Sequence, residues 1–282
     1  MWPCGHVAML NGYHWPCGYF TMKRSVIPIT GKMSSRSVAA FDGHMGTWTH
    51  EHMVFGHMDT RTHDDLLCGS HQPRESMKVS LVAASKSFGR ETVFRDLSHV
   101  FESGSRTAIL GPNGSGKSTL LQCVAGALTL TKGSIAHEVD GNMLEQEQVY
   151  RHVSIAAPYL NLYEELSLAE TIGFHARFKP LRAGIDVQTL ARTAMLEQHM
   201  HKPVRNFSSG MKQRLKLALA ILSDTPLLLL DEPASNLDAT GAEWFKELLA
   251  AHVDGRTLVV ASNRQEAETL LCVQRIDLAS TT

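Results

Sequence analysis

The residues Ile109–Thr119 read ILGPNGSGKST, and this glycine-rich segment carries the clearest structural signal in the chain. Gly111 is followed, after four residues, by Gly116–Ser118, which is the pattern of a phosphate-binding loop. The residues before it, Thr107–Leu110, are apolar strand formers, and Ser118–Leu128 after it have apolar side chains at helical spacing. A phosphate loop lies between a buried strand and a helix, so the sequence predicts one here.

The chemistry of this loop suits a nucleoside triphosphate. Glycines let consecutive amide groups converge on phosphate oxygens, and the N-terminus of the following helix favours an anion. We expect Lys117 to hold the β- and γ-phosphates, Ser118 to ligate Mg²⁺ and Thr119 to contact the α-phosphate. The alternative is a glycine-rich turn that binds nothing. The residues expected to bind nucleotide are Gly111, Pro112, Asn113, Gly114, Ser115, Gly116, Lys117, Ser118 and Thr119.

Composition limits the class of protein. The chain has 282 residues and a formal net charge of −1, which allows one large domain or two modest ones and gives no reason to expect nucleic acid as a partner. Its 5 cysteines are scattered, which is typical of a reducing compartment. There is neither a secretory signal nor an apolar run near the ~20 residues that span a bilayer. If the protein acts at a membrane, we expect another chain to cross it.

Residues 1–76 differ from the rest of the chain. They hold eight of the 15 histidines and show no sustained periodicity. We expect a poorly ordered extension, or a spurious one that precedes a natural start at Met77. An alternative is a metal site made by His50, His52 and His57, although these residues lack a firm ligand spacing.

Regular patterns begin at Met77. Phe88 is either an exposed aromatic that stacks on adenine or a core residue, and the pattern leaves both open. Gly126 is expected to end the helix after the phosphate loop, and Thr131–Gly133 to form a turn. The strands expected in this part of the chain are Lys78–Ala83, Thr92–Phe101 and Ser105–Leu110.

A small helical insertion is expected after a strand at Val153–Ala157. Ser167 has a glutamate three residues later, Glu170, which predicts a capping box at the start of a helix. A second helix is expected near Val187–His199. His175 is interpreted as a partly buried helix residue rather than a ligand.

The last part of the chain places polar residues at the ends of apolar elements. Ser208 is expected to cap the helix Lys212–Leu222, whose N-terminus can face an anion. The buried strand Leu227–Leu230 ends in Asp231, which suits Mg²⁺ binding, and Glu232, which suits polarisation of the attacking water. The alternative is a strand end that meets solvent. Another buried strand, Thr257–Ala261, precedes Ser262 and Asn263.

In this order, the elements of Met77–Thr282 resemble the ATP-binding subunit of ABC (ATP-binding cassette) transporters. The resemblance implies an α/β fold: a P-loop NTPase, ABC-type ATPase core with an antiparallel β subdomain and a small helical subdomain, forming one ATP-binding domain over residues 77–282. The matching segments are Gly111–Thr119 with Walker A, Phe88 with the adenine-stacking aromatic, Phe207–Met211 with the signature, Leu227–Glu232 with Walker B and its glutamate, and Ser235–Asp238 with the D-loop.

Two departures from the family pattern affect the expected catalysis. Pro158 stands where the family has a glutamine, and Asn263 where it has a switch histidine. Asparagine can still donate to a γ-phosphate oxygen but cannot carry a charge. In the signature segment FSSGM, Ser208 and Gly210 match the family while the third and fifth positions differ. We therefore hypothesise that ATP binds normally and turns over slowly, with Glu232 and Asn263 as the catalytic residues.

The resemblance also implies a mechanism and partners. Two such domains, as a homodimer or heterodimer, would close on ATP and Mg²⁺, with Ser208 and Gly210 of one facing the phosphate loop of the other. An integral membrane permease would dock against the helical insertion, so the protein would be cytoplasmic and peripheral at the inner face of the cell membrane. The alternatives are a soluble ABC-type ATPase and a slow-hydrolysing nucleotide switch not dedicated to transport. The compact cassette resembles small exporter-type subunits, including those linked to haem export.

Overall fold

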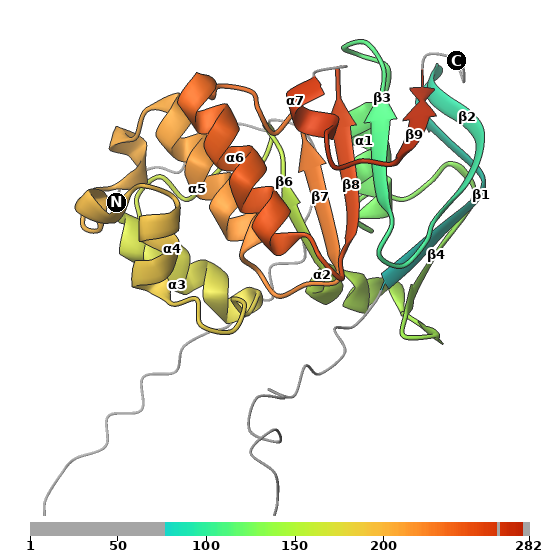
Figure 1. Ribbon diagram of the computed structural model, residues 1–282. Helices are drawn as coiled ribbons and strands as arrows, with labels where there is room; N and C mark the ends of the chain where they lie inside the picture. The colour runs from blue at the N-terminus through green and yellow to red at the C-terminus, as the bar shows by residue number, and fades with distance from the viewer. Residues whose placement is uncertain (1–76, 264–265, 279–282) are drawn as a thin grey trace, which may run out of the picture. The chain divides into compact units, whose positions relative to one another are not determined.

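The computed structural model describes residues 77–263 and 266–278 (Figure 1). The expectations for residues 1–76, including the metal hypothesis at His50, His52 and His57, lie outside the described residues. No helix in the described ranges is long and apolar enough to cross a membrane.

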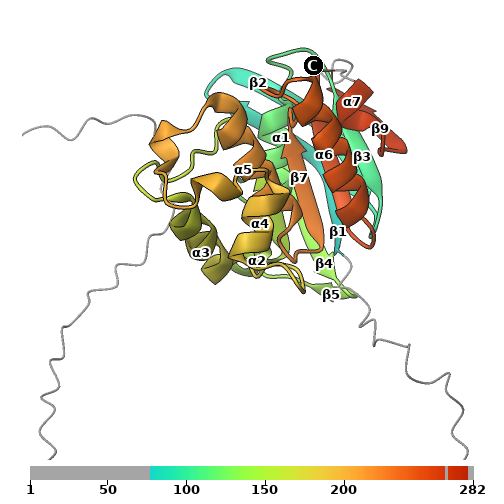
Figure 2. The same cartoon turned by 60° about the vertical axis from the view of Figure 1, so that its left-hand side comes forward.

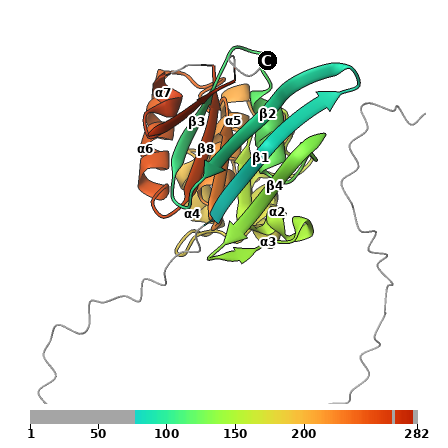
Figure 3. The ribbon, with the colours of Figure 1, turned by 90° about the vertical axis from the view of Figure 1, so that its right-hand side faces the viewer.

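An antiparallel sheet forms one layer of the fold, and Figure 3 shows three of its strands, β2, β1 and β4, side by side. Val79 pairs with Phe101 of one neighbouring strand and with His137 of the other. Met77, Val79 and Leu81 are buried and alternate with more exposed residues, as a sheet with one covered face requires. The strands in spatial order are β2 (Glu91–Phe101), β1 (Met77–Phe88), β4 (Lys132–Val139) and β5 (Asn142–Met143).

A parallel sheet forms the centre of the fold. Alternate residues of one central strand face opposite sides: Leu228 and Leu230 belong to one apolar cluster, and Leu227 and Leu229 to another. Because both faces are covered, these strands read as continuous apolar runs rather than alternating ones. The strands in spatial order are β6 (Val153–Ala156), β7 (Leu227–Asp231), β8 (Thr257–Ser262), β3 (Arg106–Leu110) and β9 (Gln274–Asp277).

Helices cover the two faces of the parallel sheet. The phosphate-loop helix α1 contacts β7 and β8 and shares its cluster with the antiparallel sheet, whereas α5 and α6 pack together in the other cluster. Figure 2 shows α3 and α4 as a separate group beside α5. The helices are α1 (Lys117–Val124), α2 (Val149–His152), α3 (Leu168–Phe178), α4 (Val187–Thr193), α5 (Ser209–Ile221), α6 (Ala239–His252) and α7 (Glu266–Thr269). The predicted fold class is confirmed.

The capping box predicted at the start of α3 is present. The Ser167 hydroxyl accepts the backbone N–H of Glu170, and the Glu170 carboxylate accepts the backbone N–H of Ser167. Both bonds satisfy N–H groups that the first turn of a helix leaves without partners. His175 lies on the same helix, partly buried, with its ring Nε2 2.8 Å from the hydroxyl of Ser223. Its interpretation as a partly buried helix residue is confirmed.

Several element boundaries differ from those predicted. Of the turn expected at Thr131–Gly133, Lys132 and Gly133 instead begin β4, and Gly133, with a φ of 80°, faces the backbone of Ala83 so closely that a Cβ would lie 2.3 Å from its carbonyl oxygen. The prediction that Gly126 ends the helix after the phosphate loop is confirmed, since α1 ends at Val124 and Gly126 follows with a positive φ. The helix expected over Val187–His199 ends at Thr193, and a 3-10 turn completes that segment.

Candidate active site

The glycines of the phosphate loop occupy conformations that other residues rarely adopt. Gly114 and Gly116 have φ values of 84° and 90°, in the left-handed region that favours glycine. At Gly116 a Cβ would lie 2.4 Å from a side-chain carbon of Val93, and at Gly111 it would lie 2.5 Å from the hydroxyl of Ser115. At Gly116 the positive φ also disfavours any side chain, whereas a side chain at Gly111 would require the Ser115 hydroxyl to move.

Lys117 is the first residue of α1 and points its ammonium group back into the loop. The side chain is 4 % exposed, and its Nζ donates to the carbonyl oxygens of Gly111 and Pro112, each at 3.0 Å. A buried ammonium group requires such acceptors. The charge is therefore fixed at the mouth of the loop, where an anion would be held.

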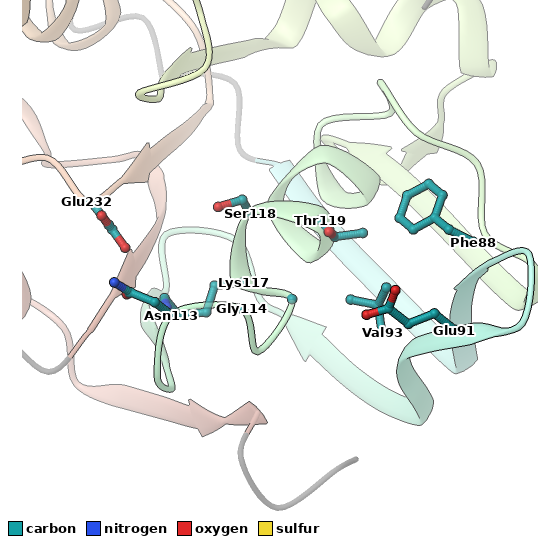
Figure 4. A pocket seen from close by; sticks show the side chains of 10 residues that line it. Phe88, Glu91, Val93, Asn113, Gly114, Lys117, Ser118, Thr119 and Glu232 are labelled. Carbon is teal, nitrogen blue, oxygen red and sulfur yellow. The ribbon is translucent and has the colours of Figure 1, made fainter. Parts of the chain in front are cut away.

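A pocket of about 340 Å³ opens over the loop and the start of α1. Figure 4 shows Glu232 at one side of it and Phe88 at the other, with Lys117, Ser118 and Thr119 between them. The sequence predicted most of this set from three separate segments, and the structure brings them together. The residues that line the pocket are Phe88, Glu91, Val93, Asn113, Gly114, Gly116, Lys117, Ser118, Thr119 and Glu232.

Asp231 lies at the end of β7 and is 2 % exposed. Both of its carboxylate oxygens are buried without a partner of ordinary hydrogen-bond geometry, although the Ser118 hydroxyl is near enough to lower the pKa of the carboxyl. Burial is the larger influence and raises this pKa, and the charge of Glu232 adds to the increase. An unpartnered buried carboxylate beside a hydroxyl is an oxygen donor set that suits Mg²⁺.

Glu232 follows directly and adopts an unusual backbone conformation. Its φ is 45°, in a region that residues other than glycine seldom occupy. Its backbone N–H donates to the carbonyl oxygen of Ala261 on β8, at 2.9 Å. This conformation lets the side chain of Glu232 reach the pocket, while the preceding Asp231 stays buried at the strand end.

Phe88 lies at the end of β1 on the rim of the pocket, and its side chain is 44 % exposed. The ammonium group of Lys86 lies 4.8 Å from the centre of its ring. A ring that is exposed and has an ammonium group over its face remains accessible for stacking, unlike the ring of a core residue. The core alternative for Phe88 is therefore wrong, and adenine stacking stays a prediction.

Seven of the expected functional residues do not line the pocket: Gly111, Pro112, Ser115, Ser208, Gly210, Asp231 and Asn263. Ser208 is the N-cap of α5 and accepts the backbone N–H of Met211 at 3.2 Å, as the sequence predicted. A Cβ on Gly210 would lie 3.3 Å from the carbonyl oxygen of Asn236. Pro158 and Asn263 are exposed, the first just beyond β6 and the second just beyond β8.

Sequence reasoning missed three residues close to the site. Glu91 and Val93 line the pocket because β2 turns back beside β1, with Phe88 paired to Glu91 across a turn at Gly89. The dipeptide Phe-Gly before a second apolar run was an available hairpin signal. Burial raises the pKa of the Tyr159 hydroxyl, and the negative charge of nearby Asp231 raises it further. No sequence pattern indicated that contact.

Comparison with known proteins identifies the family. The family model described as ABC transporter matches residues 94–235. The cytochrome c biogenesis ATP-binding export protein CcmA of Rhizobium meliloti is 32 % identical over 67 % of this chain and 92 % of its own length. The taurine import ATP-binding protein TauB of Pelagibacter ubique is 32 % identical over 66 % of this chain and 71 % of its own length.

Solved structures agree on the fold. The dimeric structure of MJ0796, a bacterial ABC transporter cassette, aligns with a TM-score of 0.61 and 23 % identity, covering 71 % of this chain and 93 % of that one. A structure of the ATP-binding subunit of an ABC transporter aligns with the same TM-score and 24 % identity, over 71 % of this chain and 85 % of the other. The chain therefore belongs to the ABC transporter family and is one of its ATP-binding subunits, an ATPase.

Proposed function

We propose that the chain binds Mg–ATP in the pocket over the phosphate loop and that hydrolysis of this ATP drives a separate membrane-spanning permease. The observation that carries the proposal is the pair of oppositely charged groups, Lys117 in the pocket and Asp231 next to it. Lys117 supplies a buried ammonium group and Asp231 a buried carboxylate whose oxygens have no ordinary hydrogen-bond partner. A triphosphate with its metal ion would complement both charges at once.

The role of each residue follows from its place. The amide groups of residues 113–119 would bind phosphate oxygens at the N-terminus of α1, with Lys117 on the terminal phosphates and Thr119 on the α-phosphate. Phe88 would stack on the adenine from the pocket rim. Glu232 would accept a proton from the attacking water, and Asn263 would donate to the γ-phosphate. The hypothesis of slow turnover, drawn from Pro158 and Asn263, stays a prediction.

Mg²⁺ fits the oxygen donors that lie next to each other beside the phosphate loop. Ser118 and Asp231 would hold it, and when bound it would neutralise charge that develops on the phosphate oxygens. We expect that Asp231→Asn will lower hydrolysis by on the order of 100-fold and abolish its stimulation by Mg²⁺, because an amide replaces the only carboxylate proposed as a ligand. The measurement is a Mg²⁺ titration of the hydrolysis rate.

The matched control for this titration is Asp224→Asn, which changes an exposed aspartate outside the pocket. We expect the Mg²⁺ dependence of Asp224→Asn to equal that of the unchanged protein. An Asp231→Asn variant with an unaltered Mg²⁺ titration would contradict the metal assignment.

A second copy of the cassette would complete the site. Ser208 and Ser209 are exposed at the N-terminus of α5 and are absent from the pocket of their own chain. A helix N-terminus attracts anions, so in a head-to-tail dimer it would face the phosphates held by the other protomer. ATP would then favour the closed dimer and hydrolysis would release it.

The helical insertion is the proposed docking surface for the permease. Phe174 contacts both Tyr163 and Phe178 edge to face, and Tyr163, Phe174 and Phe178 are 63 %, 39 % and 60 % exposed. Exposed aromatic clusters of this kind are typical of protein interfaces. Docking there would place the protein at the inner face of the membrane.

The test is co-expression with a candidate permease subunit, chosen as a membrane protein whose gene adjoins that of the cassette in its genome. We expect the two to co-purify and ATP hydrolysis to rise when both are reconstituted in lipid, whereas the triple variant Tyr163→Ser, Phe174→Ser, Phe178→Ser should keep ATP binding and lose the complex. The relatives serve both export and import, so the proposal concerns the motor common to both. Rapid hydrolysis without any membrane partner, unchanged by the triple variant, would favour a soluble ATPase.

A further inference from the structure

Glu268 is a buried carboxyl group to which the mechanism above assigns no role. It lies on α7 and is 2 % exposed. A carboxyl group removed from water needs hydrogen-bond donors. Glu268 has one for each oxygen: Oε1 accepts the backbone N–H of Ala234 at 3.0 Å, and Oε2 accepts the hydroxyl of Ser262.

The two donors belong to the two segments that flank the proposed reaction site. Ala234 comes two residues after Glu232 and directly before the segment Ser235–Asp238. Ser262 is the last residue of β8 and directly precedes Asn263. One side chain therefore connects the backbone that carries the proposed general base with the strand end that carries the proposed γ-phosphate donor.

The connected segment is under backbone strain. Glu232 and Asn236, on either side of Ala234, have φ values of 45° and 62°. Such conformations are uncommon for residues other than glycine and persist where the surroundings hold them. Gln213 of α5 holds the same segment from the opposite side, since its Nε2 donates to the carbonyl oxygen of Pro233 at 2.9 Å. Hydrogen bonds to α5 and to α7 therefore hold residues 233 and 234 in place.

The electrostatic environment agrees with this placement. Burial raises the pKa of Glu268, and the charges of Glu232 and Asp231 raise it further, so the three carboxyl groups share one region. Placing a third acid beside the catalytic pair carries an electrostatic cost. The bonds to Ala234 and Ser262 offset part of that cost by favouring the charged form of Glu268.

We infer that Glu268 is a positioning residue for ATP hydrolysis, tying the backbone after Glu232 to the end of β8 so that the Glu232 carboxylate stays aimed at the attacking water. The inference rests on the proposed function. Glu268 does not line the pocket proposed for the nucleotide. Its loss changes the orientation of Glu232 and the rate of hydrolysis, and leaves the phosphate loop and its affinity for ATP as they are.

The experiment compares Glu268→Ala with Glu268→Gln by steady-state hydrolysis and by direct ATP binding. Alanine removes both bonds. Glutamine keeps them, because its carbonyl oxygen can accept from Ala234 and its amide group can donate to Ser262. We expect Glu268→Ala to lower kcat on the order of 10- to 100-fold, the loss typical of a misplaced reacting group, with ATP affinity unchanged within about twofold. Glu268→Gln is expected to restore most of the lost kcat.

The controls separate this inference from general instability. Glu247→Ala removes an exposed glutamate and should leave kcat and ATP affinity unchanged. If Glu268→Ala does not fold, Ser262→Ala removes one of the two bonds and should lower kcat with ATP affinity retained. A full kcat in Glu268→Ala, or a Glu268→Gln variant as slow as Glu268→Ala, would overturn the inference. An unchanged protein that neither binds nor hydrolyses ATP would instead refute the proposed function.

Discussion

Lys117→Ala is expected to weaken ATP binding by roughly 10- to 150-fold, because a charged hydrogen bond contributes about 1.5–3 kcal/mol. The side chain is 4 % exposed and its ammonium group is held at the mouth of the loop by two carbonyl oxygens. Removing it leaves the phosphates of a bound nucleotide without their nearest cation. Isothermal titration with Mg–ATP measures the change in affinity.

The control for this prediction is Lys132→Ala. Lys132 is an exposed lysine at the start of β4 and does not line the pocket. Its removal changes the net charge by the same amount, so a general electrostatic effect would appear in both variants. A Lys117→Ala protein that binds ATP as tightly as Lys132→Ala would refute the assignment of the phosphate loop.

Glu232→Gln is expected to lower ATP hydrolysis by on the order of 10²- to 10⁴-fold, the contribution typical of a general base. Glutamine has nearly the same shape but cannot accept a proton, so ATP affinity should be retained. Because the bound nucleotide then persists, the variant should accumulate as a dimer in the presence of Mg–ATP. Hydrolysis assays and size-exclusion chromatography measure the two effects.

Glu247→Gln makes the same chemical change at an exposed position of α6 and should behave as the unchanged protein. Hydrolysis by Glu232→Gln at the rate of Glu247→Gln would remove Glu232 from the mechanism. A slow Glu232→Gln variant that stays monomeric with Mg–ATP would confirm the general base and contradict the proposed dimer.

The sequence predicted four strands of the parallel sheet, β3, β6, β7 and β8, and the phosphate loop beside them because these features depend on local patterns, whereas β9 was missed. The run Leu227–Leu230 is apolar throughout since both faces of β7 are covered, and Gly111–Ser118 has a spacing that the loop backbone itself demands. Such signals need no knowledge of distant contacts. Asp231 and Ser118 were assigned to one metal site from separate segments, and the structure places them side by side.

The elements that sequence reasoning missed depend on distant contacts. β4 begins with Lys132 and Gly133, which read as a turn. They belong to a strand because β1 pairs with β4 as far as Lys132, after a register shift between Val82 and Ser85. α4 stops at Thr193, and the next residues include Met195 in a left-handed conformation that no propensity favours. Glu268 reads as an ordinary helix glutamate, and only the approach of Ala234 and Ser262 makes it a buried acceptor.

Determining the structure of the Glu232→Gln variant with Mg–ATP would test the proposed nucleotide site most directly. We predict a head-to-tail dimer in which the triphosphate lies along the amide groups of residues 113–119, Mg²⁺ contacts Ser118 and Asp231, and Ser208 of the partner subunit faces the γ-phosphate. ATP bound elsewhere on the chain, or a pocket that stays empty at saturating Mg–ATP, would contradict the proposal.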